Sequence, residues 1–147
     1  MRVVIQRCKT SSVSVNNKII NKIKKGFIIL VGIAKDDTDD DLNYLVRKIL
    51  NLRVFDDESG VMNKSIIDIK GEILSISQFT LQANTKDGNR PSYINALSGD
   101  LSKDIYLKFN DKLNKEVPTF AGIFGEDMLV SIENDGPVTI IIDSKNK

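Results

Sequence analysis

The feature that most constrains the fold is an unbroken apolar run, Phe27-Ile28-Ile29-Leu30-Val31-Gly32-Ile33. A strand that is half exposed alternates apolar and polar residues, whereas a continuous apolar run of this length is typical of a strand buried on both faces. The sequence therefore predicts an interior strand over residues 27–33, with other elements packed against both of its faces.

Other strands are predicted from alternating patterns and from the turn residues that bound them. Asn16-Asn17 separates two arms near the start of the chain, and Asn134-Asp135-Gly136-Pro137 is interpreted as the connection between the last two strands. The predicted strands and arms cover residues 2–9, 11–15, 18–25, 52–55, 72–81, 128–133 and 138–143.

Two helices are predicted between the strand-rich ends. The first opens in the acidic stretch 36–41, which suits the positive end of a helix dipole, and continues through apolar residues at helical spacing to Leu50. The second places Leu101, Ile105, Phe109 and Leu113 on one face and ends before Pro118. With no repeat or linker, residues 1–147 are predicted to form a single α+β domain, with a strongly bent antiparallel sheet or small β-barrel and two main helices.

The complete absence of histidine restricts the chemistry more than any other count. It excludes Ser-His-Asp and Cys-His arrangements, and with Cys8 as the one cysteine only carboxylates remain as metal ligands. We therefore expect no metal and no cofactor. Cys8 is interpreted as a small apolar strand residue, and the aspartates of 36–41 as helix-capping and solvated groups.

Charge and hydropathy suggest where the protein acts. The net charge of +1 gives no general attraction to nucleic acid, so an RNA partner would be held by a local patch, for which Lys86 and Arg90 in a polar loop are the candidates. No apolar stretch approaches the roughly 20 residues of a membrane span, and no targeting segment is visible. A cytoplasmic location without membrane contact is predicted.

Two polar segments are candidates for a functional site. Ser77-Gln78-Phe79-Thr80 ends a predicted strand just before the polar loop, where sites commonly form. Asn134-Asp135-Gly136-Pro137-Val138-Thr139 contains a Gly-Pro pair between apolar strands, and tight connections of this kind are where cis X-Pro bonds occur. Taken alone, each also fits a plain edge strand or a simple hairpin turn.

Taken together, these segments closely resemble the D-aminoacyl-tRNA deacylase family, formerly called D-tyrosyl-tRNA deacylases. The resemblance includes the start of the chain, Met1 to Arg7, and spans nearly the whole sequence in order. Residues 86–93 are similar to the family's basic loop, in which Asn89 stands where a basic residue is frequent, and residues 122–128 to the stretch before its Gly-Pro motif.

The resemblance implies an enzyme that hydrolyses the ester between a D-amino acid, or mischarged glycine, and the 3′ end of tRNA. It implies a homodimer that needs no cofactor. Gly136-Pro137, in cis and oriented by Arg7, would reach into the other subunit's site, bind the substrate α-amino group and reject L-amino acids. Ser77, Gln78, Phe79 and Thr80 would form the catalytic pocket, and Phe124, Gly125 and Met128 are candidates for the adenine pocket.

The sequence is compatible with more than one mechanism and more than one function. Thr80 is the obvious hydroxyl nucleophile, but no histidine can activate it, so we favour water attack assisted by the substrate's own ribose hydroxyl. A related deacylase with a trans Gly-Pro that acts on L-aminoacyl-tRNA is a second hypothesis, against which Arg7 argues. A non-catalytic RNA-binding module is a third.

Overall fold

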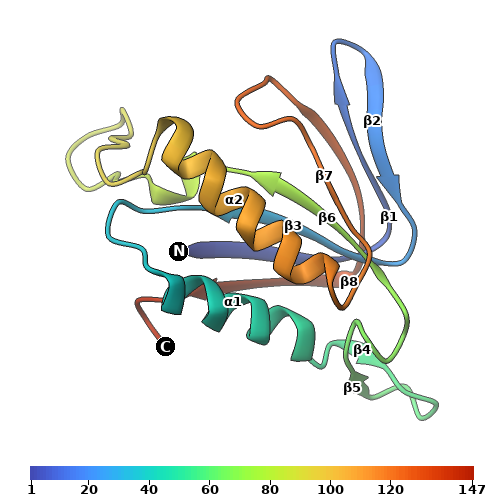
Figure 1. The fold of residues 1–147 in the computed structure, drawn as a ribbon. Coiled ribbons are helices and arrows are strands. Elements are labelled where there is room, and N and C mark those ends of the chain that lie inside the picture. The colour runs from blue at the N-terminus through green and yellow to red at the C-terminus, as the bar shows by residue number, and fades with distance from the viewer.

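A computed structural model describes all of residues 1–147 and shows a strongly curved sheet with two helices packed side by side against it (Figure 1). The elements, in chain order, are β1 (Arg2–Val15), β2 (Lys18–Ile23), β3 (Gly26–Gly32), α1 (Asp39–Asn51), β4 (Phe55–Asp56), β5 (Met62–Lys64), β6 (Glu72–Ser77), the 3-10 helix η1 (Phe79–Gln82), α2 (Gly99–Asn114), β7 (Thr119–Ala121) and β8 (Leu129–Asp143). Neither α-helix is long and apolar enough to cross a membrane.

The predicted interior strand is confirmed as β3, which pairs with β1 on one side and β6 on the other. Its side chains alternate between two apolar clusters. Phe27 and Ile29 point into the main core with the apolar faces of α1 and α2, whereas Ile28 packs with Leu74 and Ile76 in a smaller cluster. Both faces of β3 are therefore covered, as an unbroken apolar run requires.

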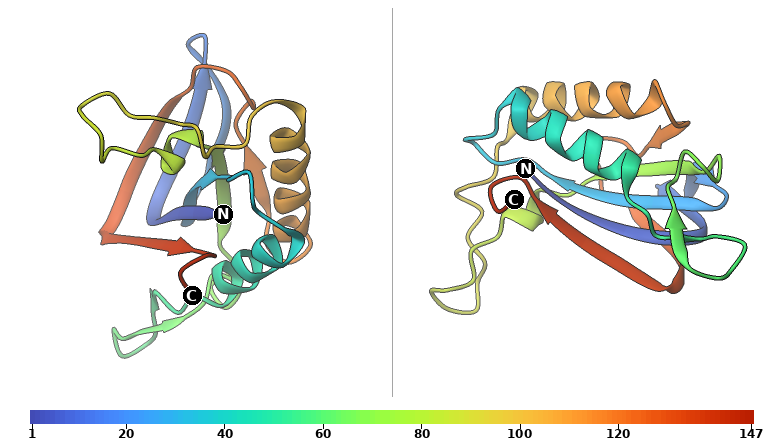
Figure 2. Two further views of the ribbon diagram at one scale, coloured as in Figure 1. Left: turned by 90° about the vertical axis from the view of Figure 1, so that its left-hand side faces the viewer. Right: turned by 90° about the horizontal axis from the view of Figure 1, so that it is seen from below.

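The predicted α+β architecture, a bent, barrel-like sheet with two main helices, is confirmed, and both helices lie on the same face of the sheet (Figure 2). The sheet order is β2-β1-β3-β6-β7, with β8 also paired to β1. The pairs β3–β6 and β6–β7 are parallel, so the sheet is mixed rather than wholly antiparallel. The reason is that α1 lies between β3 and β6 in the chain, and α2 between β6 and β7, as crossover connections do.

The predicted hairpin at residues 134–137 is wrong. β8 is one strand of 15 residues, and both of its halves pair antiparallel with the 14-residue β1, which also unites the predicted strands 2–9 and 11–15. The register shifts between Gln6 and Cys8, so Gly136-Pro137 lies in an irregularity of the ladder rather than in a turn. A bulge accepts this pair because proline has no N–H to donate to a regular ladder.

Three other boundaries differ from prediction or refine it. The strand predicted over 72–81 ends at Ser77, because β3 pairs no farther than Val31 with Ser77, and the chain then turns into η1. The strand predicted at 52–55 is the two-residue β4, Phe55–Asp56. Helix α1 begins inside the acidic stretch as predicted, with Thr38 and Asp41 forming its capping box.

The backbone of β3 at Gly26 leaves no room for a side chain beside β6, and this provides a test of the packing. A Cβ added there would lie 1.8 Å from the carbonyl oxygen of Glu72. We expect Gly26→Ala to lower the free energy of unfolding by about 3 kcal/mol or more, since the backbone of β6 has to move. Gly60→Ala is the matched control, because that site has open space and only its φ of +76° disfavours a side chain, at a cost of about 1 kcal/mol. Equal losses for the two variants in urea unfolding would contradict the close approach.

Cys8 provides a second test, because its thiol is fully buried in β1, as the sequence predicts. Burial raises the pKa of Cys8 to about 11. Hydrogen bonds with the backbone of Gly26 and Ile28 lower this pKa by less, and the negative charge of Asp135 adds a smaller increase. We expect no reaction with a thiol reagent at pH 8 until denaturant is added. In the unfolded chain the thiol ionises near its ordinary pKa of about 8.5, so between that pH and about 11 the unfolded state binds fewer protons and stability falls as pH rises. A native-state reaction as fast as that of unfolded protein would contradict the burial.

Candidate functional site

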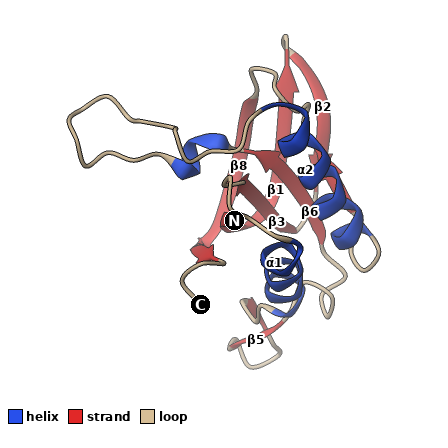
Figure 3. Ribbon diagram, turned by 60° about the vertical axis from the view of Figure 1, so that its left-hand side comes forward, coloured by secondary structure: helices blue, strands red, loops and turns tan.

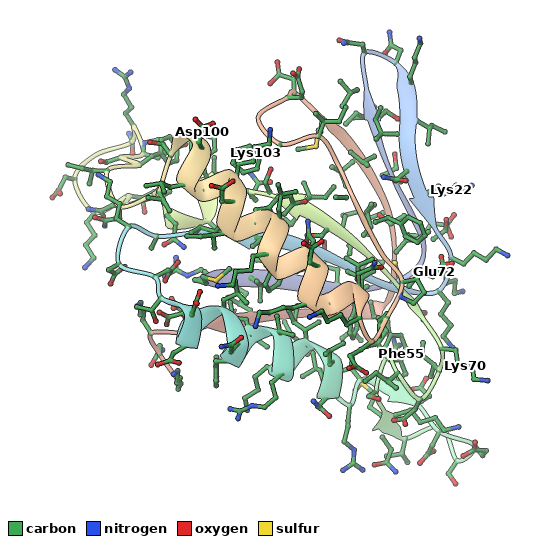
Figure 4. All side chains as sticks on the ribbon, in the orientation of Figure 1. Lys22, Phe55, Lys70, Glu72, Asp100 and Lys103 are labelled. Carbon is green, nitrogen blue, oxygen red and sulfur yellow. The ribbon has the colours of Figure 1, made fainter.

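A cavity of about 660 Å³ opens where the ends of β3 and β6, the start of α2 and the loop between β7 and β8 meet. In Figure 4, Asp100 and Lys103 mark the first turns of α2 at this end of the molecule. Six residues predicted from sequence lie in its lining: Ser77, Gln78, Phe79, Phe124, Gly125 and Met128. Two segments about 45 positions apart in the chain are thus brought together by the fold.

Other predicted residues lie elsewhere. Thr80 is adjacent to the cavity but not part of its lining, and its hydroxyl accepts a hydrogen bond of 2.5 Å from the Gln78 side-chain amide. Arg7, Gly136 and Pro137 do not line this cavity at all. The structure therefore separates the predicted site of a single chain into two parts.

The turn after β6 places backbone donors at the edge of the cavity. The Gln78 N–H donates to the Val31 carbonyl at 2.7 Å, which holds the end of β6 against β3. The first hydrogen bond of η1 runs from the Leu81 N–H to the Gln78 carbonyl at 3.2 Å. The N–H groups of Phe79 and Thr80 precede it, and the first N–H groups of a helix have no partner within that helix.

An aromatic pair stands at the mouth of the cavity. Phe79 is 55% exposed and Tyr93 39% exposed, and their rings meet edge to face with centroids 5.0 Å apart. Solvent-exposed aromatic rings beside a cavity are platforms on which nucleic-acid bases stack. The sequence identifies Phe79 as a site residue but not Tyr93, although Tyr93 is the last residue of the basic loop, residues 86–93.

The inner wall of the cavity is fixed to the core through Tyr106 on α2. Its hydroxyl donates to the Ser75 carbonyl on β6 at 2.8 Å, and its ring packs against Phe124 with centroids 5.7 Å apart. Burial raises the pKa of Tyr106, so the hydroxyl stays a protonated donor. These contacts tie α2, β6 and Phe124 together, which gives the predicted adenine-pocket residue a rigid support.

Arg7 holds the Gly136-Pro137 segment, which lies outside this cavity. Arg7 donates to the Asp135 carbonyl at 3.2 Å and to the Val54 carbonyl at 2.6 Å, and it lies 3.4 Å from the Asp135 carboxylate. The Gly136–Pro137 peptide is cis, and Gly136 has a φ of +120°. A Cβ on Gly136 would lie 3.1 Å from the Arg7 guanidinium, so the two residues are in close contact. Both Gly136 and Pro137 remain exposed.

The remaining predicted groups are on the surface. Lys86 and Arg90 are exposed on the loop between η1 and α2, which projects from the body of the molecule (Figure 3), and neither forms an ion pair. No group of three acidic or cysteine side chains is arranged to hold a metal ion.

This chain is similar to known proteins along nearly its whole length. The model of the family described as D-Tyr-tRNA(Tyr) deacylase matches residues 4–143. A D-aminoacyl-tRNA deacylase from Clostridium novyi (strain NT) is 57% identical over 148 residues, which cover 100% of this chain and 99% of that protein.

Two solved structures are similar to this one. The structure of a protein named c-Myc DNA Unwinding Element Binding Protein superposes with a TM-score of 0.93 at 43% identity, covering 97% of this chain and 98% of the other. A probable eukaryotic D-amino acid tRNA deacylase superposes with a TM-score of 0.80 at 18% identity, covering 96% and 97%, and shows the shared fold. The full-length match and the identity of the Clostridium relative show that the chain belongs to the D-Tyr-tRNA(Tyr) deacylase family, which is the family that its motifs resemble.

Proposed function

We propose that this enzyme hydrolyses the ester that joins a D-amino acid, or mischarged glycine, to the terminal adenosine of tRNA, releasing free tRNA and the amino acid. The observation that carries the proposal is the 57% identity to a D-aminoacyl-tRNA deacylase along the full chain. We propose that the reaction takes place in the cytoplasm, because Cys8 is a free thiol and the cytoplasm is a reducing compartment that keeps thiols free.

The large cavity suits the 3′ end of an aminoacyl-tRNA. Its volume of about 660 Å³ lies within the range of roughly 300–1,000 Å³ that small-molecule sites occupy. Phe79 and Tyr93 offer a surface on which adenine can stack, and Met128 and Phe124 add apolar lining. Ser77 and Gln78 then lie where the ester-bearing ribose would enter.

The rejection of L-amino acids is assigned to Gly136-Pro137 of a partner subunit in a homodimer. The motif is exposed and does not line the cavity of its own chain. It lies on β8, whose only pairing is with β1, so the other edge of this long strand is free. The exposed apolar side chains of β8, Leu129, Ile132 and Ile141, suit a strand that meets another copy of the chain.

In this dimer, backbone carbonyls of the motif accept hydrogen bonds from the substrate α-amino group. An L side chain would then be directed into the motif, whereas a D side chain or the hydrogen of glycine points away from it. Discrimination by collision does not require affinity for a particular side chain, so many D-amino acids can be accepted. Arg7 holds the motif in position through Asp135.

Catalysis is assigned to backbone donors and the substrate's own ribose hydroxyl. The N–H groups of Phe79 and Thr80 are the candidates for stabilising the ester oxyanion. The Thr80 hydroxyl accepts from Gln78 and has no base among its partners, so nothing is placed to remove its proton. Thr80 is therefore a positioning residue, and water assisted by the ribose hydroxyl is the attacking group.

Replacing the motif tests the chiral filter. Gly136→Ala combined with Pro137→Ala is expected to slow hydrolysis of D-tyrosyl-tRNA by about 100-fold, because displacing a positioning group by an ångström has an effect of this order. Glycyl-tRNA and L-tyrosyl-tRNA are assayed in parallel, and circular dichroism checks that the variant is folded. Full activity on the D-substrate with L-tyrosyl-tRNA still spared would refute the assigned role.

Mixing variants tests whether the motif acts across subunits. The motif variant and a cavity variant, Gln78→Ala with Phe79→Ala, are each expected to be impaired alone. Unfolded together and refolded at equal amounts, they form heterodimers in about half of the population, each with one intact composite site, so about a quarter of wild-type activity returns. No recovery would show that motif and cavity act within one chain.

Thr80→Val separates the two mechanisms. We expect kcat to fall by no more than about tenfold, because the variant loses a hydrogen-bonding hydroxyl but keeps the shape of the side chain. Loss of a true nucleophile typically lowers kcat by several orders of magnitude, on the scale of about 10⁴ or more. A loss of that size, together with a trapped acyl-enzyme in rapid-quench samples, would reinstate Thr80 as nucleophile.

A further inference from the structure

We infer that a second, polar hollow beside the large cavity binds the phosphodiester on the 5′ side of the substrate's terminal adenosine, with Lys35 as its phosphate-binding residue. The inference rests on the proposed function, which places that adenosine in the large cavity. It extends the binding site from one nucleotide to the backbone of the next.

The hollow has a volume of about 400 Å³ and adjoins the large cavity at Lys35, which lines both. The partition between them is a short pairing of two loop segments. The Lys35 N–H donates to the Asn95 carbonyl at 3.1 Å, and Ala34 forms an isolated antiparallel bridge with Ala96. Asn95 lines the hollow and Ala96 the large cavity, so Lys35 stands on the wall that the two share.

The charges around the hollow leave one cation without a partner. Its lining holds three cationic side chains, those of Arg2, Lys35 and Lys145, and two carboxylates, those of Asp36 and Asp143. Arg2 lies 2.7 Å from Asp143, and Lys145 lies 3.8 Å from Asp36. Lys35 is exposed and belongs to none of the ion pairs in the molecule. Its ammonium group is therefore free to bind an anion.

The part of the cavity lining that comes from the loop between β7 and β8 has the wrong sign for a phosphate. Glu126 and Asp127 line it there and are both exposed, and no lysine or arginine is paired with either. An RNA backbone leaving the cavity is repelled on that side and attracted at Lys35. The exposed Asn95 side-chain amide also lines the hollow and can add a second donor. Lys22 and Lys70 lie at a distant part of the molecule (Figure 4) and do not contribute.

The test compares a substrate that has this phosphate with one that lacks it. D-tyrosyl-tRNA carries the phosphodiester, whereas the 3′-D-tyrosyl ester of adenosine ends at the nucleoside. Lys35→Ala is expected to raise KM for D-tyrosyl-tRNA about fivefold with kcat unchanged, as the loss of one exposed ion pair does, and to leave the nucleoside ester unaffected. The slope of log KM against log salt should become shallower by about 0.7, the value for one contact to single-stranded nucleic acid.

Two further variants serve as controls. Lys35→Arg keeps the positive charge and should restore the wild-type KM and salt slope. Lys115→Ala removes an equally exposed lysine just beyond the other end of the 16-residue α2, about 24 Å from the end that lines the cavity, and should change neither value.

An unchanged salt slope in Lys35→Ala would overturn the subsite, as would equal effects of that variant on both substrates. The salt slope decides the question alone if the nucleoside ester is hydrolysed too slowly to measure. Failure of the wild-type enzyme to hydrolyse D-tyrosyl-tRNA is a different result, because it contradicts the proposed function and the subsite falls with it. The two failures are thus distinguishable by the wild-type assay.

Discussion

The pairing of β1 with β8 shifts register on both sides of Cys8, and the Arg7 guanidinium lies at the first of these shifts. Its side chain is 9% exposed, so the charge has lost most of its hydration, which is unfavourable unless hydrogen bonds replace it. The Val54 carbonyl, the Asp135 carbonyl and the Asp56 carboxylate accept those bonds, and the Asp135 carboxylate adds an ion pair. A planar fork with five donors can reach all of them at once, which a lysine ammonium cannot do. The position of Gly136 therefore depends on a buried arginine rather than on turn geometry.

The large cavity depends on a different part of the same sheet. β6 is held between β3 and β7, and it stops at Ser77 because β3 offers no further partner. The chain leaves the sheet there and turns sharply, which brings Gln78 and Phe79 to the cavity and places backbone N–H groups at its edge. The arginine-held motif thus lies apart from most of the cavity lining, which β8 reaches only at its start, through Val130. An assembly that brings the motif of one copy to the cavity of another would unite them without any change in either.

Sequence reasoning succeeded where local pattern and tertiary demand agree. The run 27–33 predicts an interior strand because apolar residues on both faces have to be buried on both sides. Both helices are predicted from the helical spacing of their apolar residues, and α1 also from its acidic first turn at Asp39. It failed at Asn134 to Pro137, where turn-forming residues occupy a bulge inside a long strand, since composition cannot tell which partner strand runs alongside. Thr80 was placed in a strand for the same reason. Tyr93 and Lys35 were missed because only the fold brings their loops to the cavity.

The lack of histidine limits which groups in the cavity can take part in catalysis. The ionisable side chains in the cavity lining are those of Lys35, Tyr93, Glu126 and Asp127, and the chain has no histidine to add to them. General acid–base catalysis by an imidazole is therefore excluded, and the proposed reaction draws on backbone dipoles and on the substrate's hydroxyl. Backbone groups are not removed by a single side-chain substitution in the enzyme. Their hydrogen bonds to the substrate also do not depend on which side chain the substrate carries. A filter and an oxyanion site made from backbone can thus treat many D-amino acids alike, while the handedness of the Cα atom alone decides which esters reach attack.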